Sequence, residues 1–145
     1  MKFIVEQSLG QDEVEITVRC GLIDERLQRL IEQIRLYGFS LVGKREGASY
    51  VLHLEGIDYF ESVEERTYAY TQDGVYECAP RLYELEQQLG GTDFVRVSKA
   101  CLLNTGRVDS VRPCLDGKLE ALLENGERVL VNRHYVKGFK EKFGL

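Results

Sequence analysis

The sequence lacks the long apolar segments that mark membrane and exported proteins. It contains no run of about 18 apolar residues, so no segment is predicted to span a membrane. At the N-terminus only three apolar residues separate Lys2 from Glu6, which is too few for the apolar core of a signal peptide. We therefore expect a cytoplasmic protein.

Clustered cysteines are also absent. The four cysteines are far apart and form no CxxC pair: Cys20, Cys78, Cys101 and Cys114. A metal site or a disulfide framework would favour closer, patterned spacing. The spacing favours small buried hydrophobic side chains in a reducing compartment over either alternative.

The residues needed for catalysis are scarce. The chain has two histidines, and His53 lies between Leu52 and Leu54 in a predicted strand, a position more typical of a sheet face than of a catalyst. The glycines form no glycine-rich motif, so no phosphate-binding loop is predicted. Glu61, Glu64 and Glu65 resemble a carboxylate pair but are more typical of a solvated strand edge. These features predict a protein that is not an enzyme and needs no cofactor or metal.

What the sequence does contain is a change of charge along its length. Its net charge is −5. Residues 93–145 nevertheless carry ten Lys and Arg against seven Asp and Glu, whereas residues 44–92 carry four against ten. A basic end on an acidic protein indicates a polyanionic partner that the overall charge would conceal.

The apolar pattern predicts a mainly β protein with short helices, an α+β fold. In residues 1–43 we expect two strands, Lys2–Glu6 and Val14–Cys20, followed by a helix that Asp24 caps and Gly38 ends. This β-β-α unit is too small to hold a core alone. A polar connection, Gly43–Gly47, leads into the second unit, residues 44–145.

The second unit is predicted to be mostly β, with one helix starting at Pro80 and another closing the chain. Its expected strands are Tyr50–Leu54, Ile57–Ser62, Thr67–Gln72, Val75–Cys78, Asp93–Val97, Arg107–Val111, Lys118–Leu123 and Arg128–Val131. The final helix is expected from about Arg133 to Lys142. Asp73-Gly74 between aromatic-rich runs is the clearest hairpin signal.

Basic and polar residues follow the strands of the basic end. Arg96, Ser98 and Lys99 follow one strand, Asn104 and Arg107 flank the next turn, and the last hairpin is followed by Arg133, His134, Tyr135 and Lys137. Guanidinium and ammonium groups suit phosphate oxygens and guanine edges, and Asn or Ser adds directional hydrogen bonds. Composition alone does not separate this interpretation from a merely solvated surface.

The same segment resembles the LytTR DNA-binding domain of bacterial transcriptional regulators. Phe94–Asn104 followed by Val108 matches the order of aromatic, Arg, short loop and apolar residues in that family. Further similar pieces occur in the same order at Ile57–Val63, Thr67–Thr71, Tyr83–Glu86, Arg112-Pro113, Gly117-Lys118, Leu123–Glu127, Val129–Val131 and Arg133–Val136. The resemblance covers about residues 45–145.

The resemblance implies small, elongated β-sheets whose loops and strand ends reach into successive major grooves. It transfers DNA contacts to Arg66 with Thr67, to Ser98 with Lys99, and to Arg133 with His134. Ser98 stands where many members have His, and Ala100 stands where many have Ser. We thus predict DNA-binding residues that combine this set with Asn104, Arg107 and Lys137.

The resemblance also bears on organisation and partners. The chain has no room for the receiver domain of response regulators, so it is similar to stand-alone LytTR regulators, which are often encoded beside a small membrane protein. We expect a sequence-specific regulator that binds paired DNA repeats as a homodimer, with residues 1–43 as a dimerisation or regulatory extension. The alternative is a module of the same fold that mainly docks a regulatory protein.

Overall fold

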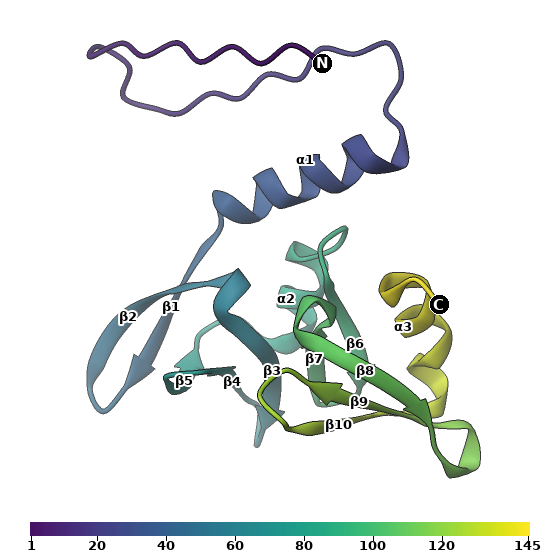
Figure 1. The fold of residues 1–145 in the computed structure, drawn as a ribbon. Coiled ribbons are helices and arrows are strands. Elements are labelled where there is room, and N and C mark those ends of the chain that lie inside the picture. The colour runs from purple at the N-terminus through teal and green to yellow at the C-terminus, as the bar shows by residue number, and fades with distance from the viewer.

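The computed structural model describes residues 1–145, which form two antiparallel sheets and three α-helices (Figure 1). The helices are α1 (Glu25–Tyr37), α2 (Leu82–Gln88) and α3 (Val136–Phe143). The strands are β1 (Ser40–Arg45), β2 (Ala48–His53), β3 (Ile57–Val63), β4 (Arg66–Thr71), β5 (Gly74–Cys78), β6 (Phe94–Ser98), β7 (Cys101–Asn104), β8 (Val108–Pro113), β9 (Leu119–Leu123) and β10 (Arg128–Val131). The predicted mainly β, α+β fold is confirmed. None of the helices is long and apolar enough to cross a membrane.

The larger sheet has seven strands in the order β2-β1-β5-β4-β3-β7-β6. Short hairpins join most of its neighbours, including the predicted β4–β5 hairpin, in which Thr71 lies opposite Gly74. One face of this sheet and α2 enclose the larger core, where Phe60, Leu85 and Leu54 are fully buried.

The smaller sheet, in the order β10-β9-β8, packs with α3 against the outer strands of the larger sheet. Val97 of β6 and Leu103 of β7 are buried against Leu123 and Phe139. Neighbouring positions on the same two strands, such as Leu102, point into the larger core. Strands β6 and β7 therefore join the two cores into one body.

Helix α1 forms as predicted but is only loosely attached to this body. The Asp24 carboxylate accepts a hydrogen bond from the Leu27 amide at 2.8 Å, and the helix ends at Gly38. No residue of α1 is buried, and only Leu36 of the helix and Phe39 beyond it pack against the larger core. Figure 1 shows α1 between the β body and the N-terminal segment.

The two strands predicted before α1 do not form. Residues 1–24 contain no strand, and the segments Lys2–Glu6 and Val14–Cys20 run beside each other without a ladder of hydrogen bonds (Figure 1). The prediction rested on alternation of apolar and polar residues. Alternation favours a strand only when a third strand or a helix covers the apolar face, and an isolated two-stranded hairpin is marginal in water.

Two other segments were wrongly predicted as connections. Residues 43–45 belong to β1, and the turn is reduced to Glu46 and Gly47, both with positive φ. Gly43 is required inside the strand because a Cβ there would lie 2.6 Å from Leu52 Cδ1. Strand β7 was not predicted, since its four residues are too few to show alternation. The boundary expected at residue 43 falls inside β1.

Candidate nucleic-acid interface

Three connections meet at one end of the larger sheet. They are the β3–β4 turn at Glu64-Glu65, the β6–β7 turn at Lys99-Ala100, and the turn of 3-10 helix at Arg133–Tyr135 that follows β10. The Ser62 amide donates to the Ala100 carbonyl at 2.8 Å, which fixes the first two turns to each other. The Asn132 amide donates to the Val97 carbonyl at 2.9 Å and fixes the third. The three contact regions implied by the resemblance therefore lie together.

The cations of the β6–β7 turn and of the C-terminal segment are unpaired. The cations Lys99, Arg133 and Lys137 are exposed, as is the neighbouring His134, and none of the four takes part in an ion pair or a side-chain hydrogen bond. The Ser98 hydroxyl oxygen accepts a hydrogen bond from the Ala100 amide at 3.3 Å, so its O–H remains free to donate. Unpaired cations beside a free hydroxyl suit phosphate oxygens.

The β3–β4 turn differs in charge and in accessibility. Arg66 forms an ion pair with Glu77 at 3.9 Å and follows Glu64 and Glu65. Thr67 is only 2 % exposed and cannot reach a partner outside the protein. The resemblance alone gives no indication of this burial.

A groove of about 460 Å³ lies beside Arg133, with walls that contain no apolar residue. Lys118 and Asp116 of the β8–β9 connection form one wall, and Asn132, Arg133 and His134 form the other. Gly117 has a φ of 73°, and a Cβ on it would lie 3.2 Å from Arg133 Cδ. The aliphatic part of Arg133 therefore lies against the backbone of this turn.

Lys118 belongs to the candidate interface although it was not among the predicted residues. It stands at the end of the β8–β9 connection and lines the same groove as Arg133. The sequence separation between the two residues hides this proximity. The turn signal Asp116-Gly117 beside a lysine, together with the family-like piece Gly117-Lys118, could have suggested it.

Asn104 and Arg107 lie at the opposite end of β7, away from the three turns. The Asn104 amide nitrogen donates to the Ile57 carbonyl at 2.9 Å, and its side-chain oxygen accepts from the Gly106 amide at 3.0 Å. The Arg107 guanidinium donates to the Glu55 carbonyl and pairs with Glu124 at 3.7 Å. Both side chains hold the fold together at this end, and the structure does not bring them to the candidate interface.

Two arginines of the basic end are also used within the protein. Arg112 and Arg128 both contact the Glu120 carboxylate on the smaller sheet, at 2.8 Å and 2.5 Å. The hydrogen bond from Arg128, followed by the charge of Arg112, lowers the pKa of Glu120. The net positive charge of residues 93–145 therefore resides mainly in the unpaired lysines and Arg133.

A polar cluster lies on β3 and β4, next to the start of β7. Tyr70 Oη donates to Glu61 Oε1 at 2.9 Å, and the Tyr70 ring stacks on Tyr59 with centroids 4.4 Å apart. Burial and the bond to Glu61 raise the pKa of Tyr70 to about 12. Burial, together with the charge of Glu61 on the neighbouring strand, raises the pKa of Cys101 to about 12. Cys101 thus remains a neutral thiol.

Comparison with known proteins identifies relatives of this chain. A Staphylococcus aureus protein named as an HTH-type transcriptional regulator is 23 % identical over 147 residues, covering 100 % of this chain and 99 % of its own length. The sensory transduction protein LytT of Enterococcus faecalis is 38 % identical over 88 residues, which cover 60 % of this chain. Those residues are only 36 % of the LytT length.

The solved structures show the same fold. A LytTr DNA-binding domain from Bacillus cereus superposes with a TM-score of 0.69 at 21 % identity, covering 73 % of this chain and 97 % of that one. Despite the name of the Staphylococcus relative, α2 and α3 here are separated by five strands and form no helix-turn-helix pair. Residues 47–144 match the LytTr DNA-binding domain family. The chain belongs to that family.

Proposed function

We propose that this protein is a transcriptional regulator that binds double-stranded DNA sequence-specifically as a homodimer on paired repeats. The observation that carries the proposal is the joining of the β6–β7 turn to the segment after β10, which brings the unpaired cations of both to one end of the sheet. The family match and the regulator names among the relatives support it.

The side chains divide into two groups by how firmly they are held. Arg133 lies against Gly117, so its guanidinium is the best placed group for a bidentate contact to a guanine edge. Lys99 and Lys137 are free on exposed segments and suit phosphates, as does the hydroxyl of Ser98. Lys118 and His134 line the groove beside Arg133 and extend the phosphate surface.

Other predicted contacts are weaker candidates. Asn104 and Arg107 are excluded from the proposal because their side chains serve internal hydrogen bonds at the other end of β7. Thr67 is buried. Arg66 is included only as a secondary contact, since Glu77 already accepts its charge.

The test is a binding titration of the full-length chain against the DNA upstream of its own gene, with an unrelated duplex of the same length as control. If each protomer neutralises about four phosphates, log K should fall with log[salt] at a slope of roughly −3 to −4. Equal affinity for both duplexes would contradict sequence-specific binding. Absence of binding at low salt would instead favour the alternative, a module that docks a regulatory protein.

A further inference from the structure

The N-terminal segment, residues 1–24, exposes apolar side chains that the chain itself does not cover. Phe3, Val5, Val14, Ile16 and Val18 occupy alternating positions on the two extended stretches and are 41–84 % exposed. In residues 1–23 the one backbone hydrogen bond joins the Gln11 amide to the Ser8 carbonyl at 3.1 Å, in the turn between the stretches. Both the apolar groups and the backbone of this segment therefore lack partners.

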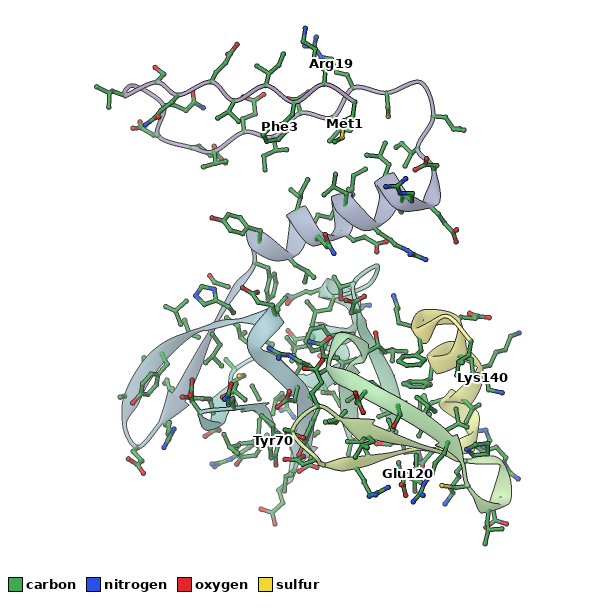
Figure 2. The ribbon with its side chains drawn as sticks, viewed as in Figure 1. Met1, Phe3, Arg19, Tyr70, Glu120 and Lys140 are labelled. Carbon is green, nitrogen blue, oxygen red and sulfur yellow. The ribbon has the colours of Figure 1, made fainter.

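Helix α1 adds one exposed apolar side chain to this surface. Leu27, Leu30, Ile31 and Ile34 share one face of the helix; Leu30 is 44 % exposed, and the other three are partly covered. Figure 2 shows Phe3 on the side of the N-terminal segment nearer to α1, whereas Arg19 points away from the helix. Alternation then places Val18 and Ile16 on the side of Phe3. The apolar side of the segment therefore lies nearer to α1, and no strand of the chain pairs with its backbone.

The exposed apolar side chains are numerous enough to take part in a protein interface. Each partner of a stable complex buries about 800 Å², and eight large apolar side chains of this region are 41–84 % exposed. The side chains counted are Phe3, Val5, Val14, Ile16, Val18, Leu22, Ile23 and Leu30. A hairpin and one helix cannot close a layer of that size, whereas two hairpins and two helices form the usual two-layer arrangement.

The charges of the longer stretch, Val14–Cys20, match a second copy of itself. In an antiparallel pairing with a two-fold axis at Thr17, Glu15 lies opposite Arg19 of the other chain and Ile16 lies opposite Val18. Because the pairing is symmetric, each of these contacts occurs twice. Opposite charges and aliphatic pairs directly across an antiparallel pair stabilise it.

From these observations we propose that residues 1–37 of two chains form a dimerisation unit, in which the Val14–Cys20 stretches pair about Thr17. The four extended stretches become one sheet, and the two copies of α1 cover its apolar face. This deepens the homodimer of the proposed function by naming the surface that forms it. Strand pairing between chains supplies the backbone hydrogen bonds that one chain cannot make.

The experiment is sedimentation equilibrium of the full-length chain without DNA. The wild-type protein should be a dimer, and Glu15→Arg should raise the dimer dissociation constant about tenfold or more because two like-charge pairs replace two opposite ones. The double variant Glu15→Arg/Arg19→Glu should restore the wild-type value. Glu141→Arg is the matched control, since it makes the same change of charge on α3, outside residues 1–37, and should leave the constant unchanged.

Three outcomes would overturn the inference: a wild-type chain that stays monomeric at high concentration, a double variant that is no tighter than Glu15→Arg alone, or a control that weakens the dimer equally. Circular dichroism of each variant shows whether the β body remains folded. Binding to a DNA duplex with a single half-site distinguishes failure of this inference from failure of the proposed function. Glu15→Arg should bind it as the wild type does, whereas a dimer that binds no DNA would contradict the proposed function alone.

Discussion

The β3–β4 and β6–β7 turns lie side by side at one end of the same sheet, yet they differ in what they offer to a ligand. The first carries Glu64 and Glu65 ahead of an arginine that is already paired with Glu77. The second carries Lys99, which is unpaired and exposed. Because the two turns share a position in the fold, we propose that the pairing of each charge decides whether a turn can attract a polyanion.

The C-terminal segment after β10 resembles the β6–β7 turn in this respect. Arg133 has no acidic partner, and its stem is supported by Gly117. Support of the stem reduces the rotamer freedom that binding would otherwise have to remove. We therefore expect the order of importance Arg133, then Lys99, then Arg66, and each prediction below tests one step of that order.

The largest effect is expected for Arg133→Ala. Loss of a bidentate guanine contact should weaken specific binding by about 1–3 kcal/mol and relax the preference at one base pair. Binding titrations against a set of singly substituted operators measure both. Arg112→Ala is the matched control, because that arginine is paired with Glu120 and should leave affinity unchanged. Equal weakening on every duplex would make Arg133 a phosphate contact instead.

A smaller, uniform effect is expected for Lys99→Ala. Removing one phosphate contact should weaken binding about threefold to tenfold at low salt on all sequences and make the salt slope shallower by about 1. The slope is obtained from titrations at several salt concentrations. A variant with an unchanged slope and altered sequence preference would show that Lys99 contacts a base rather than a phosphate.

An increase in affinity is expected when the acidic turn is neutralised. Glu64→Gln/Glu65→Gln removes two carboxylates that lie next to the proposed DNA surface, and binding should become about two- to threefold tighter at low salt. The same substitution at Glu141, on α3, serves as a control for net charge. Weaker binding by the double variant would mean that these carboxylates accept hydrogen bonds from the DNA.

The comparison also shows which parts of the site can be predicted from sequence. Lys99 and Arg133 were predicted because cations after strands stand out in the chain. Asn104 and Arg107 have the same signature, but a polar residue beside a turn serves equally well to cap the backbone, as Asn104 does for Ile57 and Gly106. A side chain that contacts DNA differs from one that holds the fold together only in whether it has a hydrogen-bonding or charged partner within the protein. Such partners come from distant parts of the sequence.

The fold was predictable wherever one chain supplies all the neighbours of an element. The alternation in Ile57–Ser62 and Thr67–Gln72 yields strands, because each has a paired strand and a core to cover it. The same alternation in Val14–Cys20 does not, because nothing in the chain covers it. Strand formation depends on tertiary neighbours, which an alternation pattern alone cannot supply.

The smallest effect is expected for Arg66→Ala. Arg66 already pairs with Glu77, so a contact with DNA would replace that ion pair and gain little, and loss of the side chain should change binding little. Exposed ion pairs of this kind contribute roughly 0–1 kcal/mol, and we expect a change in binding below about 0.5 kcal/mol.

A double-mutant cycle with Glu77→Gln decides whether pairing is the cause. In the Glu77→Gln background Arg66 is free, so Arg66→Ala should then weaken binding more than it does in the wild-type protein. A cycle without coupling would mean that Arg66 is out of reach of the DNA, and the difference between the two turns would then lie in their geometry rather than in the pairing of their charges.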